Sequence, residues 1–145
     1  MTKEKSTHRE FRNISLVDLV SYVRRFPASA WVSLLHRVSG ALLFVLLPAI
    51  IWAFDASVSS EYSFAKLKNV FENGFGVFPG WLFKLVVLAV LWSYLHHLTA
   101  GLRFLVLDTH HAAVEKQSSG RSAKWVLMVS VLLTVAFGAK VFGLY

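Results

Sequence analysis

Three long apolar runs dominate the pattern of hydrophobic and polar positions along this chain. They cover about residues 28–54, 81–107 and 125–144. The hydrocarbon core of a bilayer is about 30 Å thick, and a helix rising about 1.5 Å per residue crosses it in about 20 residues. Each run is long enough to do so. The pattern therefore predicts an all-α integral membrane protein, in which residues 28–145 form an anchor of three transmembrane helices.

The polar segments divide the chain further. Residues 1–27 are predicted to be an N-terminal segment on the cytoplasmic side, and their charged start lacks the apolar region of a signal peptide. Within them, residues 14–23 space their apolar positions as a short amphipathic helix at the membrane interface would. Residues 55–79 are predicted to connect the first two spans, and residues 109–124 to form a short polar loop.

Composition agrees with the membrane assignment and excludes several chemistries. The chain is 56% hydrophobic and 16% charged, and it contains no Cys. Thiolate ligation, iron–sulfur ligation by this chain and disulfides are thereby excluded, so any redox chemistry needs an added cofactor. No nucleic-acid-binding motif accompanies the net charge of +7.

The distribution of Lys and Arg predicts the orientation. Of the 15 basic residues, eleven lie in the N-terminal segment, at the start of the first span, or from the end of the second span to the start of the third. Four lie on the other side. Basic residues favour the cytoplasmic side, so the N-terminus is predicted to be cytoplasmic and the C-terminus periplasmic.

The second span contains His96, His97 and Arg103, which are unusual inside a membrane. A charged side chain at the centre of a spanning helix costs at least about 2.5–3.5 kcal/mol, so such residues normally face a partner, a cofactor or water. Gly101 lies one turn from His97 and leaves room for a flat group near the backbone. We interpret His97 as a haem ligand. His96 points about 100° away and is expected to meet a neighbouring helix or a carbonyl.

The first span has a narrow polar face made by Ser33, His36, Arg37 and Gly40. If the first two spans are antiparallel, Arg37 and His97 lie about 6 and 5 Å to the cytoplasmic side of the span midpoints, and Ser33 about 12 Å. These side chains could also have purely structural roles. His97 could be a hydrogen-bonding contact between helices, Arg37 could extend towards the surface, and the glycines could serve packing.

Two motifs resemble the cytochrome b subunit of succinate dehydrogenase, the larger membrane anchor of respiratory complex II. One is SLLHRVSG at residues 33–40, and the other is His97-x3-Gly101-x-Arg103-x4-Asp108. The resemblance extends over about residues 24–125, with three spans in the expected order. It departs from the family pattern at Phe104, where a His often follows the Arg, and in lacking the upstream Arg-Pro.

The resemblance implies specific roles. His97 would be one axial ligand of a haem b whose other ligand comes from a second, smaller membrane subunit. His36 and Arg37 would face the haem propionates, and Ser33 and Arg37 would line the ubiquinone pocket beside the iron–sulfur subunit. The implied protein is a multi-pass subunit of the bacterial inner membrane in the tricarboxylic acid cycle and electron transport. It would help pass electrons from succinate, oxidised on the flavoprotein subunit, to ubiquinone.

The chain itself would carry no dehydrogenase site. Three alternatives stay open at this point. The chain could be the anchor of a fumarate reductase, or a b-type cytochrome subunit of a hydrogenase or formate dehydrogenase. It could also be a haem-free scaffold or small transport protein whose polar residues only join helices.

Overall fold

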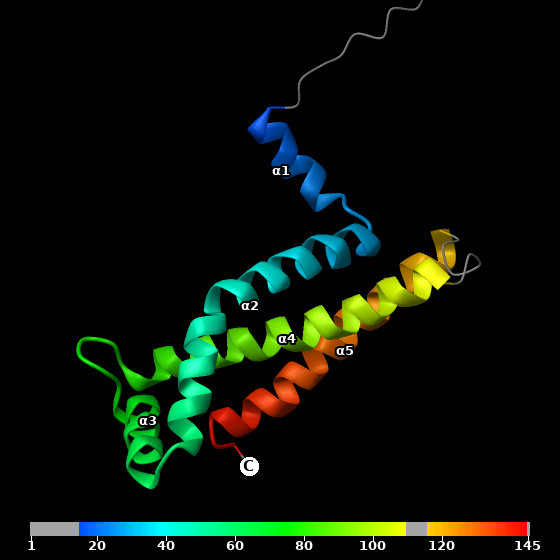
Figure 1. Cartoon of the computed structure of the whole chain (residues 1–145). Coiled ribbons are helices and arrows are strands. Elements are labelled where there is room, and N and C mark those ends of the chain that lie inside the picture. Colours follow the sequence, from blue (N-terminus) through cyan, green and yellow to red (C-terminus); the bar gives the residue numbers. More distant parts are fainter. Residues whose placement is uncertain (1–14, 110–115, 145) are drawn as a thin grey trace, which may run out of the picture.

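The computed structural model describes residues 15–109 and 116–144, and every regular element in them is a helix (Figure 1). Three of the helices are long and apolar enough to cross a membrane, which confirms the predicted all-α, three-span fold. In chain order the helices are α1 (Leu16–Arg24), α2 (Ala28–Val58), α3 (Glu61–Asn73), α4 (Gly80–Thr109) and α5 (Lys116–Val141).

The helix bounds differ from the sequence-based ones mainly at the third span. It was predicted over 125–144, but α5 begins at Lys116 and ends at Val141. The polar residues 116–124, predicted to be loop, form the first turns of this helix, because two of their serines hydrogen-bond to Arg103 in α4. The rest of the predicted loop, residues 110–115, lies outside the described residues. So do residues 1–14, which hold most of the predicted N-terminal segment.

Short-range capping sets the ends of the smaller helices. Ser15 caps α1 by accepting a hydrogen bond from the backbone N–H of Asp18. Ser60 and Ser63 form a reciprocal capping box that starts α3. Gly74 ends α3 with φ of 92°, and a Cβ there would lie 2.2 Å from the Phe78 carbonyl oxygen, so this turn requires glycine.

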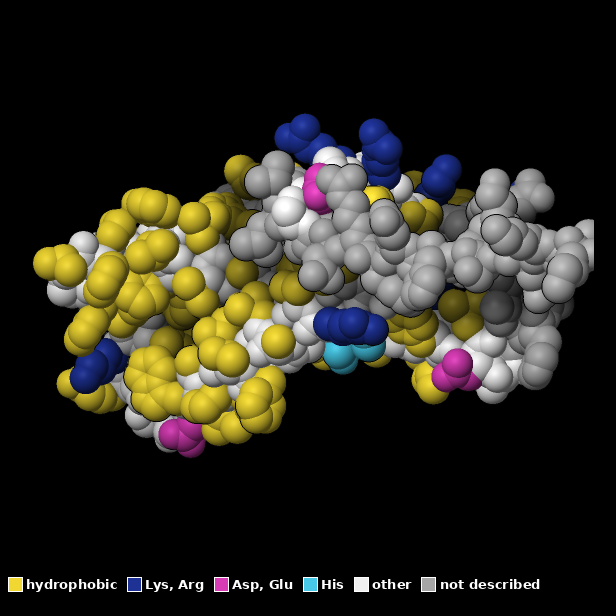
Figure 2. All heavy atoms as spheres, turned by 90° about the horizontal axis from the view of Figure 1, so that it is seen from above, with side chains coloured by type: hydrophobic (Ala, Val, Ile, Leu, Met, Phe, Trp, Pro, Cys, Tyr) yellow, Lys and Arg dark blue, Asp and Glu magenta, His cyan; other side chains and the backbone are white. Residues whose placement is uncertain are grey.

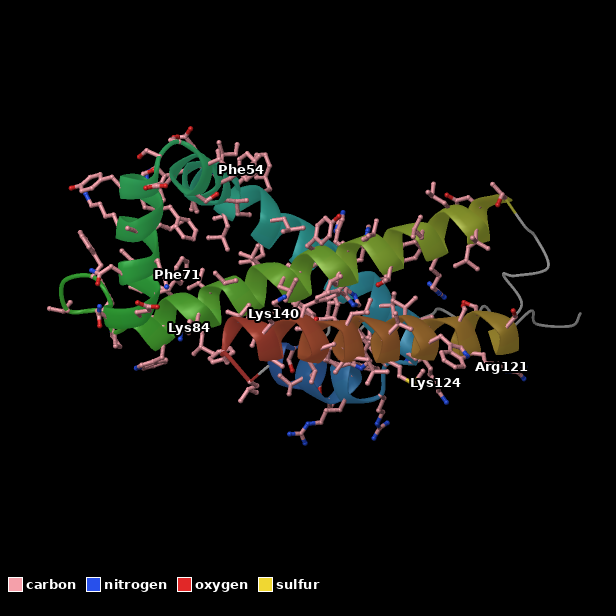
Figure 3. All side chains as sticks on the ribbon, turned by 90° about the horizontal axis from the view of Figure 1, so that it is seen from below. Phe54, Phe71, Lys84, Arg121, Lys124 and Lys140 are labelled. Atoms are coloured by element: carbon pink, nitrogen blue, oxygen red, sulfur yellow. The ribbon has the colours of Figure 1, made fainter. Side chains whose placement is uncertain are left out.

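Helix α4 is the centre of the arrangement, because both α2 and α5 pack against it (Figure 1). Helix α2 changes direction along its length, and Pro48 lies inside it, where a missing N–H and a bulky ring bend a helix. Helix α3 and the C-terminus lie at one end of the bundle. Lys84 and Lys140 lie towards that end, whereas Arg121 and Lys124 lie towards the other (Figure 3).

Many large apolar side chains are exposed on the outside of the bundle, and Figure 2 shows a group of them on one face. Phe44 is 78% exposed and Trp52 is 63% exposed. The interior is instead made of small or polar side chains, and the fully buried ones include Val32, Ser39, Ser93, His96 and Ser130. This arrangement suits a lipid environment, in which small residues let helices approach closely and buried polar groups link them.

Candidate functional site

The polar residues of α2 and α4 meet where the sequence predicted a common layer. The imidazole rings of His36 and His97 stack with their centroids 4.1 Å apart and their planes 10° apart. Phe104, which stands where the family pattern often has a histidine, contacts the His36 ring edge-on at 5.2 Å. The two histidines are therefore close neighbours across the α2–α4 interface.

The His97 ring is oriented by the backbone of α2. Its Nδ1 atom lies 3.1 Å from the carbonyl oxygen of His36. Since a carbonyl can only accept, Nδ1 donates this hydrogen bond, and in the neutral ring the lone pair is then on Nε2. Within the described chain no group hydrogen-bonds to Nε2. An imidazole with Nδ1–H bonded to a carbonyl and Nε2 free is the form that ligates a metal ion in proteins.

Ser39 adds a further polar contact to this arrangement. It is completely buried, and its hydroxyl donates to the same His36 carbonyl at 3.0 Å. Its Oγ atom also lies 3.5 Å from Nδ1 of His97. The carbonyl that orients His97 therefore accepts from two side-chain donors. Ser39 belongs to the SLLHRVSG motif, but sequence reasoning assigned it no role.

Two glycines, Gly40 in α2 and Gly101 in α4, face the stacked rings across the helix interface. A Cβ on Gly40 would lie 2.8 Å from Cε1 of His97, which is closer than side chains pack. A Cβ on Gly101 would lie 3.5 Å from Nε2 of His36, which is an ordinary contact. The ring beside Gly101 is thus that of His36, and the glycine that makes room for His97 is Gly40 on the facing helix.

Arg37 and Ser33 remain available to a ligand or a partner. Arg37 is exposed and Ser33 is half-buried. Within residues 15–109 and 116–144 neither side chain makes a hydrogen bond or an ion pair. Figure 2 shows cationic and histidine side chains lying against each other on one face of the molecule. A guanidinium next to imidazoles can bind an anionic group such as a carboxylate.

His96 points away from this site, as expected from its angle to His97. It is completely buried, and its Nδ1 atom lies 3.2 Å from Oγ of Ser130 in α5. Its ring stacks on Trp92 with the centroids 5.4 Å apart. Its environment is therefore the helix interface rather than the face that His97 occupies.

Arg103 has a role that sequence reasoning missed. Its side chain is 8% exposed and donates to Oγ of Ser122 at 3.0 Å, and to the carbonyl and Oγ of Ser119 at 3.0 and 2.9 Å. It therefore ties the cytoplasmic ends predicted for α4 and α5 to each other. The signal was the Ser-x-x-Ser spacing at residues 119–122, which places both hydroxyls on one helical face.

Comparison with known proteins agrees with the two motifs. The family model described as the succinate dehydrogenase/fumarate reductase transmembrane subunit matches residues 12–137. The succinate dehydrogenase cytochrome b556 subunit of Coxiella burnetii is 33% identical over 123 residues, or 84% of this chain and 90% of that protein. The subunit of the same name from Paracoccus denitrificans is 29% identical over 113 residues, or 78% of this chain and 81% of that protein. The predicted resemblance is thus confirmed, and the chain belongs to the family of succinate dehydrogenase/fumarate reductase transmembrane subunits.

Proposed function

We propose that this chain is the haem b- and quinone-binding membrane anchor of a succinate:quinone oxidoreductase. The main observation behind the proposal is the hydrogen bonding and burial of the His97 ring. Its Nδ1–H is bonded to the His36 carbonyl, Nε2 is free, and the ring is half-buried between two spanning helices. The names of the cytochrome b556 relatives support haem b as the group involved.

His97 would be the axial ligand that this chain supplies to haem b. A six-coordinate haem of this kind needs two axial ligands. His96 is enclosed in the bundle and His36 lies over Gly101, so we infer that the second ligand comes from a smaller membrane subunit. When bound, the haem supplies a one-electron store. His36 and Arg37 would bind its propionates, since Arg37 is exposed and lacks an acidic partner among the described residues.

Ser33 and Arg37 would hold the quinone. They lie one helical turn apart on α2, so both side chains project to the same face. The Ser33 hydroxyl can donate to a quinone carbonyl. The Arg37 guanidinium can stabilise the negative charge that appears on the quinone oxygens during reduction, because a fixed positive group is already in place when the charge develops. We expect ubiquinone as the substrate.

The remaining partners follow from this role. The chain would contribute no dehydrogenase site, so succinate would be oxidised on a flavoprotein subunit and electrons would pass through an iron–sulfur subunit. These peripheral subunits would lie at the end of the bundle where α2 begins, which we assign to the cytoplasmic side of the bacterial inner membrane. The charge distribution supports this orientation, with the C-terminus in the periplasm.

A tagged copy of the chain, purified with its partners, tests the proposal. We expect a flavoprotein and an iron–sulfur protein to be recovered with it, and the reduced complex to show a Soret band with α and β bands. His97→Leu should abolish or shift the low-spin haem spectrum, and His96→Leu, as the matched control, should keep most of it. Equal loss in both variants would contradict the assignment of the ligand.

The family description also names fumarate reductase, which is the second candidate. The two activities run in opposite directions. Comparing succinate oxidation by ubiquinone with fumarate reduction by a low-potential quinol in the purified complex separates them. A complex without any haem absorption would instead favour a haem-free scaffold.

A further inference from the structure

His96 occupies the point at which the three spanning helices meet. It projects from α4, its Nδ1 atom faces Ser130 in α5, and its ring lies beside the backbone of Val32 in α2. It is the largest of the completely buried side chains, with none of its surface exposed. The site proposed above does not use it.

The His96 ring has polar neighbours on two helices. Its Nδ1 atom lies 3.2 Å from Oγ of Ser130, and that hydroxyl also lies 3.1 Å from the carbonyl oxygen of Leu127. The backbone of Val32 forms a hydrogen bond to the ring from α2. The bond to Ser130 is therefore the polar contact that links this ring to α5.

Three of the contacts between α4 and α5 lie at different levels of the helix pair. Leu88 lies against Gly138, where an added Cβ would be 2.5 Å from Cδ1 of Leu88. The Arg103 hydrogen bonds join the opposite end of the two helices. The His96 contact lies between these two, at the level of His97. Since consecutive helical residues point about 100° apart, α4 is held at this level by His97 against α2 and by His96 against α5.

We propose that His96 is a positioning residue for His97, acting by setting the rotation of α4 about its own axis. This inference rests on the proposed role of His97 as a haem ligand. A side-chain atom lies about 5–6 Å from the helix axis, so a rotation of about 10° moves it by about 1 Å. Displacements of that size exceed the tolerance of about 0.5 Å for a well-positioned site. Losing the His96–Ser130 bond therefore changes the orientation of the His97 ring without removing the ligand.

Four variants of the assembled complex test this. His96→Leu and Ser130→Ala both remove the hydrogen bond, and Ser130→Ala does so with the loss of one oxygen atom. His96→Asn is the rescue variant, because its amide nitrogen is bonded to Cγ as Nδ1 is and can donate to Ser130. Thr134→Val is the matched control. Its buried hydroxyl donates to the Ser130 carbonyl at 2.7 Å, one turn away, whereas His96 contacts the Ser130 side chain.

The readout is the electron paramagnetic resonance spectrum of the oxidised haem, normalised to haem content, together with its reduction potential. The low-spin g values depend on the relative orientation of the planes of the two haem ligands. Loss of part of the complex lowers the amplitude of the signal but leaves the g values unchanged. We expect His96→Leu and Ser130→Ala to retain most of their haem and to shift the g values beyond the spread of replicate preparations. His96→Asn and Thr134→Val should match the parent protein.

Two results would overturn the inference. Unchanged g values in Ser130→Ala would show that the hydrogen bond does not orient His97, even if His96→Leu fails to assemble. Equal shifts in Thr134→Val and Ser130→Ala would show a general effect of removing buried hydroxyls. If His97 is not a haem ligand, the result differs from both of these, because His97→Leu would then retain a low-spin haem.

Discussion

Gly40→Ala is the sharpest test of the site, because the structure predicts an effect opposite to that of helix propensity. The added Cβ would lie 2.8 Å from Cε1 and 3.1 Å from Nδ1 of His97. Restoring an ordinary contact of 3.4–4 Å requires the ring to move by at least about half an ångström. Its bond to the His36 carbonyl, 3.1 Å long, would then exceed the usual hydrogen-bond length.

The expected cost follows from overpacking and from the lost hydrogen bond. Overpacking a close contact costs about 1–3 kcal/mol, which corresponds to a roughly 5- to 150-fold weaker affinity for haem. Alanine favours a helix interior over glycine by about 1 kcal/mol, so α2 itself is not weakened. We therefore expect a complex that assembles but has a reduced haem-to-protein ratio, measured by haem extraction and absorbance after dilution or mild heating.

Gly101→Ala is the matched control. Its Cβ would lie 3.5 Å from Nε2 of His36, an ordinary contact, so this variant should keep its haem. Equal haem retention by the two variants would refute the argument that Gly40 makes room for the ligand. Haem loss in Gly101→Ala alone would instead favour the sequence-based prediction that Gly101 accommodates the flat group.

Three further predictions concern the quinone, the helix interface and the topology. Ser33→Ala should keep the haem spectrum and succinate oxidation with an artificial acceptor, but it should lower quinone reduction at least several-fold. A lost hydrogen bond of about 1–3 kcal/mol corresponds to a rate loss of roughly 5- to 150-fold. Unchanged quinone reduction would exclude this contact. Arg103→Lys should lower the thermal unfolding midpoint of the complex more than Arg103→Met, because Lys keeps the buried charge but cannot reproduce the forked hydrogen bonds. The reverse order would mean that the charge itself stabilises the helix pair. Cysteine at the exposed Ser118 should react with impermeant reagents from the cytoplasmic side and cysteine at Ser59 from the periplasmic side, whereas reversed labelling would overturn the proposed orientation.

The sequence by itself determined the fold class and the depths of the site residues. Three apolar runs of spanning length leave few alternatives to three helices, because a backbone in lipid must satisfy its own hydrogen bonds. A constant rise per residue then predicts the depth of each side chain along its own helix, so Arg37 and His97 could be assigned to one layer without coordinates. The two motifs were sufficient to predict the family.

Only the tertiary structure decided how the helices are rotated against one another and where α5 begins. Sequence periodicity relates the faces of one helix, but the angle between two helices depends on packing and on hydrogen bonds between residues far apart in the chain. Only the tertiary structure shows that Gly40 makes room for the His97 ring, because this close contact is made across the interface. The polarity of residues 116–124 predicts a loop, yet these residues are helical. Two of their serines accept hydrogen bonds from Arg103 in α4, and the sequence does not show that these residues are close in space.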